Sequence, residues 1–220
     1  MTPCHKLHRL INQMYRFSFP FDPSAIPCNG IYILFESGEC AHGVDRIVRV
    51  GTHTGQHQLP SRLCQHFLNE NKDRSIFRKN IGRALLNREK DPFLAQWELD
   101  LTTREAKLRH SGRINFDKQQ NIETQVSKYI RKNFTFVALR VESKASRLEL
   151  ESKIISTASM CRECSSSDEW LGRHSPKAKI CISGLWLVNE LYKNPLSQSD
   201  LNHLKAIAQV PLYPSTPTTV

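Results

Sequence analysis

The sequence predicts a small α/β domain of the α+β type, with a three-stranded, mainly antiparallel sheet flanked by helices. Two short runs rich in β-branched and aromatic residues, at 30–35 and 47–51, indicate a hairpin of two strands. A third such run, at 134–141, indicates the third strand. Apolar residues at helical spacing before, between and after these runs predict helices around the sheet.

Residues 1–25 form an N-terminal arm in this interpretation. A helix over 5–15 places four apolar residues on one stripe: Leu7, Leu10, Ile11 and Met14. Prolines then end this helix and lead into the first strand in an extended conformation. We expect the arm to pack on the core.

The main domain is expected over residues 26–191. The two hairpin strands are joined by a polar, glycine-containing loop at 37–45. In the second strand Ile47 and Arg49 share one face, because side chains alternate along a strand. Further helices are expected over 59–67, 75–86, 119–132, 146 onward and 197–208.

Two serines are placed to begin helices. Ser75 is a suitable N-cap for the helix over 75–86, whose core stripe contains Phe77 and Ile81. Ser146, followed by Glu149 three residues later, matches a capping box.

Three segments have weaker patterns. Residues 87–118 have no single clear pattern, and within them 93–99 fits a helix or a strand equally. Residues 161–178 are rich in loop-forming residues. Residues 192–220 form a C-terminal helix and a flexible tail from 211.

Composition points to an anionic partner. The 220 residues carry a formal net charge of +10, with a pI near 9.4. Nucleic acid is the commonest partner of such a chain, although a merely solvated or ribosome-associated surface is the alternative. No apolar run approaches the length of a membrane span and no hydrophobic signal core opens the chain, so a cytoplasmic location is the default expectation.

The seven cysteines are odd in number and irregularly spaced, which favours reduced thiols over a disulfide scaffold. Cys161 and Cys164 form a lone CxxC pair, and His174 with Cys181 is one set that completes a zinc site. We expect free thiols here, with neither zinc nor a disulfide required.

Arg62 and His66 are four residues apart on one helix and therefore share a face. A guanidinium binds phosphate in bidentate fashion, and an imidazole donates a hydrogen bond or moves a proton. Both residues could equally be ordinary solvent-facing positions.

Their context resembles the GIY-YIG nuclease superfamily. The resemblance rests on Gly30-Ile31-Tyr32, on Val50-Gly51, and on Arg62 and His66, in that order. It covers residues 26–160, with a looser extension to 191. Compared with the minimal family core, residues 87–118 would be an insertion that shapes DNA contacts or a dimer surface. Arg49 departs from the family pattern, because it stands where the family usually has tyrosine.

The resemblance implies one-metal hydrolysis of DNA. Tyr32 would take or relay the proton of the attacking water, Arg62 would stabilise charge on the phosphate and His66 would orient or relay protons. Arg49 would put a guanidinium in the site, where it can bind a phosphate oxygen. The family also has an asparagine after its glutamate helix, and Asn189 is our substitute for it.

The metal-binding glutamate of the family is assigned to Glu151. At roughly 100° per residue, and counted from Leu148, Glu151 falls inside the apolar arc of its helix and Glu149 faces solvent. A carboxylate in a buried stripe is costly unless it is paired or binds a metal. A buried ion pair is therefore the alternative to a Mg²⁺ or Mn²⁺ site.

A set of basic residues on and beside the helix over 75–86 is assigned to DNA phosphates: Lys72, Arg74, Arg78, Lys79 and Arg83. A solvated charged face is the alternative. Together these assignments predict a divalent-metal-dependent endonuclease of the restriction type, which acts on double-stranded DNA and could form a homodimer. The alternatives are a catalytically inactive DNA-binding protein, a DNA-repair nuclease and an RNA-processing or ribosome-associated protein.

Overall fold

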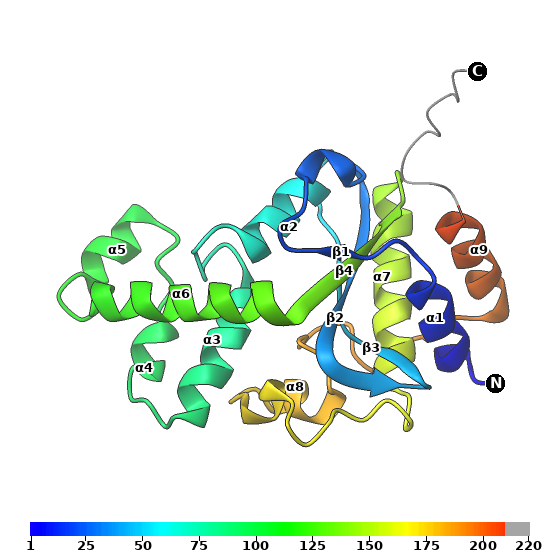
Figure 1. The fold of residues 1–220 in the computed structure, drawn as a ribbon. Coiled ribbons are helices and arrows are strands. Elements are labelled where there is room, and N and C mark those ends of the chain that lie inside the picture. The colour runs from blue at the N-terminus through cyan, green and yellow to red at the C-terminus, as the bar shows by residue number, and fades with distance from the viewer. Residues whose placement is uncertain (210–220) are drawn as a thin grey trace.

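The structure is a computed structural model that describes residues 1–209. It confirms the α/β class, with an antiparallel sheet flanked by helices (Figure 1). The strands are β1 (Phe17–Ser18), β2 (Gly30–Ala41), β3 (Val44–Gly51) and β4 (Phe134–Arg140). Their order in the sheet is β1-β4-β2-β3, and every neighbouring pair is antiparallel.

The helices surround this sheet. The α-helices are α1 (Pro3–Asn12), α2 (Leu59–Phe67), α3 (Ile76–Arg88), α4 (Leu94–Trp97), α5 (Arg104–His110), α6 (Phe116–Asn133), α7 (Lys144–Ser159), α8 (Ala178–Ser183) and α9 (Gln198–Ala208). Two short 3₁₀ helices, η1 (Pro23–Ala25) and η2 (Leu171–His174), complete the list. The predicted tail at 211–220 lies outside the described residues.

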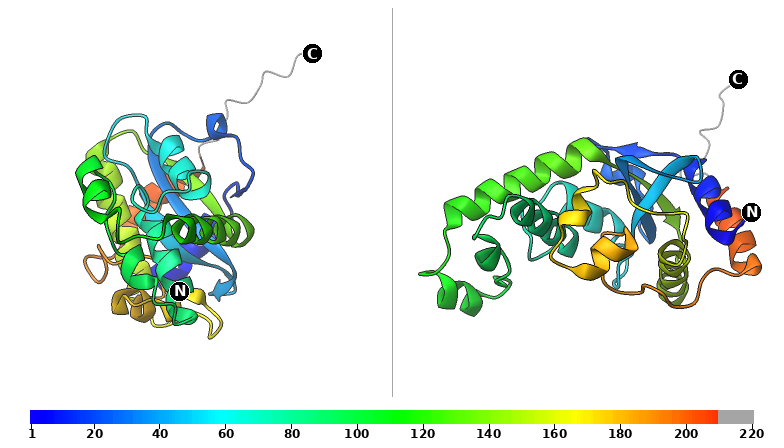
Figure 2. Two further views of the ribbon diagram at one scale, coloured as in Figure 1. Left: turned by 90° about the vertical axis from the view of Figure 1, so that its left-hand side faces the viewer. Right: turned by 90° about the horizontal axis from the view of Figure 1, so that it is seen from below.

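The sheet has a hydrophobic core on each face, as strand alternation requires. Tyr32, Leu34 and Phe136 face a core shared with α2, α3 and α6. Ile33 and Val137 face the other core, which α1, α7 and α9 cover. Figure 1 shows these two helical layers on opposite sides of the strands, and Figure 2 shows α6 extending away from the sheet beside α3, α4 and α5.

The sheet has four strands rather than three, because the N-terminal arm contributes one. Phe17 of β1 pairs with Phe136 of β4, and the two rings stack 5.0 Å apart. The arm therefore packs on the core as expected, and it does so through both α1 and β1. Among the described residues, no helix is long and apolar enough to cross a membrane.

The loop predicted at 37–45 is wrong. β2 continues to Ala41, β3 begins at Val44, and the chain turns within two residues, His42 and Gly43. Both have positive φ, of 54° and 75°, which is the geometry of a two-residue hairpin turn. Glycine suits one of these positions, and the polar residues that suggested a longer loop belong to an extended hairpin.

The predicted facing of β3 is also wrong, because the strand has a bulge. Leu34 pairs with Arg49 but Phe35 pairs with Ile47, so Val48 is the extra residue. As a result Ile47 packs in the α1–α7 core, while Arg49 turns toward Tyr32 on the other face. The bulge thus aims the guanidinium into the site described below.

The start of α7 differs from the predicted capping box. The N-cap is Ser143, whose hydroxyl accepts from the Ser146 backbone N–H. Leu148, the reference for the predicted apolar arc, is 41% exposed. The apolar positions of this helix that are buried are Leu150, Ile154, Ile155 and Ala158.

Candidate active site

Two positions of the hairpin require glycine, because neighbouring atoms lie too close to them for a side chain to fit. A Cβ at Gly30 would lie 2.0 Å from the carbonyl oxygen of Leu139 on β4. A Cβ at Gly51 would lie 2.2 Å from the hydroxyl oxygen of Tyr32. Gly51, the last residue of β3, therefore makes room for the tyrosine of β2.

Tyr32 and His66 form one hydrogen-bonded chain. The Tyr32 hydroxyl lies 2.7 Å from His66 Nε2, and His66 Nδ1 lies 2.7 Å from the hydroxyl of Ser75, the N-cap of α3. Both rings are buried. Burial first, and then the positive charges of Arg62, Arg49 and Arg78, hold the pKa of His66 well below its usual value. His66 is therefore a neutral imidazole that joins two hydroxyl groups.

Arg49 is the second partner of Tyr32. Its Nε donates to the Tyr32 hydroxyl at 3.3 Å, and its Nη1 donates to the carbonyl oxygen of Trp186. Its guanidinium carbon lies 5.2 Å from the centre of the Phe77 ring. These contacts fix the arginine at the position where the pattern described in the sequence analysis has a tyrosine.

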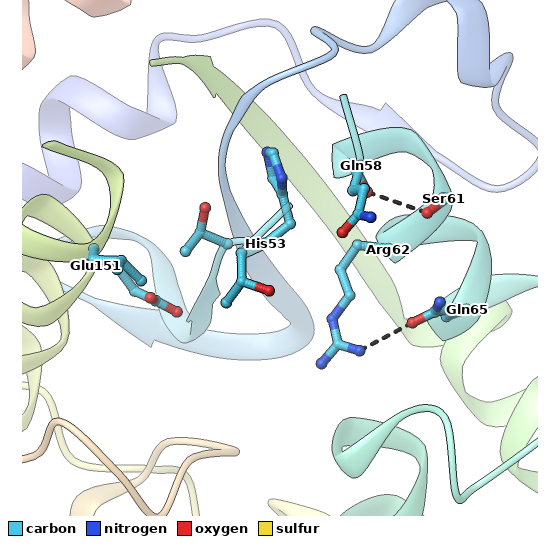
Figure 3. A pocket seen from close by; sticks show the side chains of 9 residues that line it. His53, Gln58, Ser61, Arg62, Gln65 and Glu151 are labelled. Carbon is cyan, nitrogen blue, oxygen red and sulfur yellow. Dashed lines mark hydrogen bonds between the residues drawn. The ribbon is translucent and has the colours of Figure 1, made fainter. Parts of the chain in front are cut away.

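Arg62 and Glu151 line one cavity of about 360 Å³. Figure 3 shows Glu151, from α7, and Arg62, from α2, on opposite sides of the space. Arg62 Nη1 donates to Gln65 Oε1 and to the Arg74 carbonyl oxygen, both at 3.0 Å. The guanidinium is thus held in place, and no carboxylate neutralises it within the described part of the chain.

A second cavity, of about 270 Å³, adjoins the first through Glu151. Arg49 and Asn189 both line it, together with Glu190. The structure therefore brings Arg49, Arg62, Glu151 and Asn189 to two cavities that share one carboxylate. Tyr32 and His66 line neither cavity. They are connected to the second cavity by the hydrogen bond from Arg49 to Tyr32.

Comparison with protein families matches residues 4–211 to the model of the GIY-YIG domain, which is nearly the whole chain. The chain belongs to the GIY-YIG family. This is a family of nucleases, and the matched range includes both α1 and α9. Searches of the curated proteins and of the solved structures find no significant match.

Glu151 is the carboxylate that lines both cavities. Burial raises its pKa to about 7, although Arg49, the Thr52 backbone N–H and Arg62 oppose this rise. Near neutral pH the carboxylate therefore takes up either a proton or a cation. Glu149 is different, because it is exposed and pairs with Lys153 at 2.7 Å. The donor chemistry thus fits one hard cation at Glu151 and offers nothing comparable at Glu149.

The basic helix face predicted on α3 is not exposed. The guanidinium of Arg78 is fully buried; its Nη2 donates to Glu123 Oε2 at 2.7 Å, and its Nη1 donates to the His66 carbonyl oxygen at 3.1 Å. Arg83 donates to Glu98 through two 2.6 Å bonds. These cations hold protein groups, and in this structure they are not free for phosphate.

The two lysines are also engaged. Lys72 is buried, pairs with Asp73 at 2.8 Å and donates to the Leu99 carbonyl oxygen at 2.7 Å. Lys79 donates to the Glu98 carbonyl oxygen at 2.9 Å. Of the five assigned residues only Arg74 is exposed, and its backbone touches Arg62.

Sequence reasoning missed several residues of the GIY-YIG site. His53 and Gln65 line the first cavity and Glu190 lines the second. His53 follows the strand end so closely that it reads as a turn residue, and both its nitrogens are bonded, to Gly30 N and Gly55 O. Gln65 was detectable from its position three residues after Arg62 on one helix. Nothing local marks Glu190, which lies 39 residues after Glu151 in sequence.

Proposed function

We propose that this GIY-YIG protein is an endonuclease that hydrolyses phosphodiester bonds of double-stranded DNA with one Mg²⁺ or Mn²⁺. The observation that carries the proposal is the pair of Arg62 and Glu151 facing one cavity, with the Arg49–Tyr32–His66 chain behind it. A cation and a carboxylate across one space suit a phosphate and its metal.

Each residue has a role in this reaction. Arg62 binds a phosphate oxygen and stabilises the charge that grows in the transition state. For Tyr32 to accept the proton of the attacking water, as its own hydroxyl proton passes to His66 Nε2, bound DNA must open the cavity wall in front of it. Because the pKa of His66 is low, the imidazole carries this proton only transiently, and the proton ends on the leaving oxygen.

Glu151 would hold the metal. A bound Mg²⁺ or Mn²⁺ supplies charge neutralisation at the phosphate and the leaving oxygen. Asn189 lines the second cavity, which Glu151 also lines, and would hydrogen-bond a ligand water or a phosphate oxygen. Arg49 fixes Tyr32 and contributes positive charge beside Glu151.

The decisive experiment is cleavage of plasmid DNA with Mg²⁺ or Mn²⁺, compared with EDTA. Glu151→Gln abolishes cleavage and leaves DNA binding intact, whereas the control Glu149→Gln, on the same helix but exposed, cleaves like the parent. Equal activity of the two variants would remove Glu151 from the mechanism. Discrete fragments point to a restriction-type enzyme, and cleavage only at branched or damaged DNA points to a repair nuclease.

Thermal stability tests the metal site without cleavage. The folded pKa of Glu151 is about 7 and its ordinary value is 4.5, so the folded state binds this proton more tightly. The resulting stabilisation is complete below about 4.5 and is lost as pH rises through 7. In metal-free buffer, Glu151→Gln should therefore gain stability relative to the parent between pH 5 and pH 8. Added Mn²⁺ should reduce that difference by stabilising only the parent.

One observation favours a second function, sequence-tolerant DNA binding without cleavage. Tyr32 is only 1% exposed and lines neither cavity, and Arg49 replaces the family tyrosine. A parent protein that binds DNA but never cuts it with any divalent metal would establish this alternative.

A further inference from the structure

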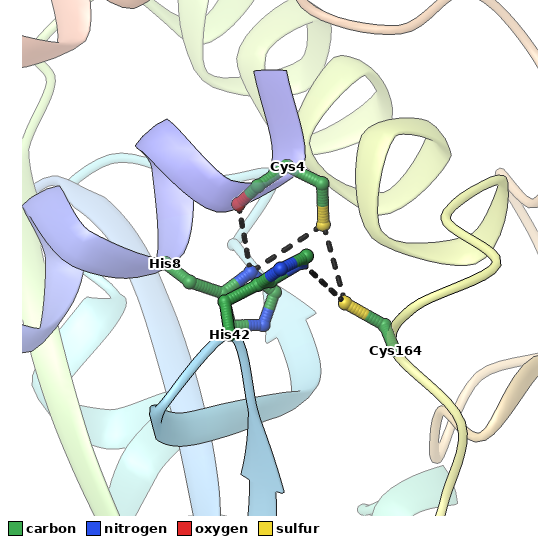
Figure 4. Close-up of side chains that lie close together, drawn as sticks. All are labelled: Cys4, His8, His42 and Cys164. Carbon is green, nitrogen blue, oxygen red and sulfur yellow. Dashed lines mark hydrogen bonds between the residues drawn. The ribbon is translucent and has the colours of Figure 1, made fainter. Parts of the chain in front are cut away.

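A group of cysteine and histidine side chains lies at the tip of the β2–β3 hairpin. Cys4 comes from the first turn of α1, His42 from the hairpin turn, and Cys161 and Cys164 from the segment after α7. Figure 4 shows Cys4, His42 and Cys164 converging, together with His8 of α1. Helix α7 continues for eight residues beyond Glu151 to its end at Ser159, a rise of about 12 Å, and Cys161 follows that end, so this cluster is separate from the active site.

Three distances between the ligand atoms are close to those of a metal site. Cys4 Sγ lies 3.3 Å from Cys164 Sγ, and His42 Nε2 lies 3.1 Å from Cys164 Sγ and 3.5 Å from Cys161 Sγ. The ligand atoms of Cys4, His42 and Cys164 all lie within 4.8 Å of one another. A tetrahedral zinc ion with Zn–S of about 2.3 Å and Zn–N of about 2.0 Å separates its ligands by roughly 3.5–3.8 Å. For the three pairs given above, shifts of a few tenths of an ångström suffice. The sulfur separation is also well beyond a disulfide bond of about 2.05 Å.

His8 belongs to the same group of side chains, but its nitrogens are already used. Its Nδ1 lies 2.9 Å from the carbonyl oxygen of Cys4, and its Nε2 lies 3.1 Å from the backbone N of Ile47. Nδ1 therefore carries the proton and Nε2 accepts. Burial lowers the pKa of His8 to about 4, in agreement with a neutral ring. His8 thus holds α1 to β3 and leaves no lone pair for a metal.

The surroundings of His42 are those of a metal ligand. Its Nδ1 lies 3.3 Å from a carboxylate oxygen of Glu163, while its Nε2 faces the sulfurs. A carboxylate behind a histidine fixes the ring and raises its basicity toward a metal. The His5 ring stacks on His42 at 5.0 Å and holds it further.

The three thiols are packed against one another and against one imidazole nitrogen. Cys4 Sγ touches Cys164 Sγ, and His42 Nε2 lies within 3.5 Å of both sulfurs of the CxxC pair. Adjacent thiolates repel one another, whereas a divalent cation between them allows all three to be deprotonated.

We infer that Cys4, His42, Cys161 and Cys164 form a structural zinc site, with Glu163 orienting His42. The two cysteines of the CxxC pair have the spacing common in zinc sites. Four protein ligands close the coordination shell, which is typical of structural rather than catalytic zinc. The ion cross-links the arm, the hairpin tip and the end of the helix that carries Glu151. This replaces the sequence-based expectation of free thiols.

The test measures zinc in the purified full chain, and it is independent of cleavage. We expect one zinc ion per chain. Cys4→Ser, Cys161→Ser, Cys164→Ser and His42→Gln should each lose it. The controls Cys28→Ser and Cys40→Ser, which change exposed thiols, should retain it. His8→Gln should retain zinc even where it lowers the melting temperature.

Cobalt uptake by the parent protein covers the case in which the variants fail to fold. Co²⁺ in the emptied protein should give the intense visible and thiolate charge-transfer bands of a tetrahedral site with three thiolates. A parent chain that takes up neither Zn²⁺ nor Co²⁺, or that carries a Cys4–Cys164 disulfide by mass spectrometry, would overturn the site. Zinc kept by Cys161→Ser but lost by His8→Gln would overturn the ligand set.

Discussion

Helices α2 and α3 both carry basic residues, but the structure uses their charges in opposite ways. On α2, Arg62 stands at a cavity and is held only by neutral oxygens. On α3 every residue from Phe77 to Leu86 is buried, and Arg78 and Arg83 each face a carboxylate. A cation is available to a phosphate only where no other layer of the protein covers it.

The difference arises because residues 87–118 and helix α6 cover α3. Trp97 packs against Gly82, where a Cβ would lie 2.3 Å from the indole ring. Its Nε1 donates to the Lys79 carbonyl oxygen at 3.0 Å, and the adjacent Glu98 binds Arg83. Glu123 of α6 neutralises Arg78. The proposed DNA contact therefore falls to α2 and its surroundings.

The largest expected effect of breaking this arrangement is on stability. Arg78→Ala leaves Glu123 buried without its partner, which typically costs about 3–5 kcal/mol. Urea unfolding should show this loss of stability. The substitution also leaves the His66 carbonyl oxygen without its Arg78 donor. Arg74→Ala is the matched control and should change the unfolding free energy by less than about 0.5 kcal/mol. A loss of under about 1 kcal/mol for Arg78→Ala would mean that the charge of Arg78 on α3, like that of Arg62 on α2, is not needed to hold the protein together.

Arg62→Ala should have the opposite effect, a large loss of cleavage with little change in stability. Removing a preorganised donor to the transition-state charge lowers cleavage by about 10²–10³-fold. Unfolding should change little, because Arg62 bonds only to Gln65 and a backbone carbonyl. Arg62→Lys should recover part of the activity by restoring the charge. An active Arg62→Ala enzyme would instead show that the open cation is not used.

Tyr32→Phe tests the hydrogen-bonded chain from Arg49 through Tyr32 to His66. It removes one oxygen and little packing, and it leaves Arg49 Nε and His66 Nε2 without their shared partner. Cleavage should fall by at least about a hundredfold, the usual effect of a general base or relay. The control is Tyr129→Phe, whose hydroxyl binds Glu36 elsewhere and which should cleave normally. Normal cleavage by Tyr32→Phe, with loss of cleavage in His66→Gln, would move the base to the histidine.

Local patterns in the sequence were sufficient for much of the fold. The strand runs, the stripe of α6 and the cap at Ser75 were predicted because each depends on neighbouring residues. The placement of Arg62 and His66 on one helix follows from the same local spacing.

What could not be predicted depends on contacts that are distant in sequence. Arg78 pairs with Glu123, 45 residues away, and Cys4 meets Cys164 across 160 residues. The bulge that turns Arg49 toward Tyr32 arises from register, which the alternation of residues in β3 does not reveal. The sequence therefore shows which charged residues and cysteines are present, but the partner of each one is known only from the three-dimensional packing.

The smallest expected effect concerns Arg74, the one assigned cation that is exposed. It is next to Arg62 in space, since its carbonyl oxygen accepts from the Arg62 guanidinium, so DNA that reaches Arg62 passes its side chain. Loss of a single phosphate contact should weaken binding equally on all sequences and lower the salt slope of log Kd by about one unit. Arg83→Ala, at a cation already bound to Glu98, should leave that slope unchanged. Titration of a labelled duplex at several salt concentrations measures both variants. If Arg83→Ala lowers the slope and Arg74→Ala does not, DNA binds along α3 after all, and the ion pairs seen there must open when DNA arrives.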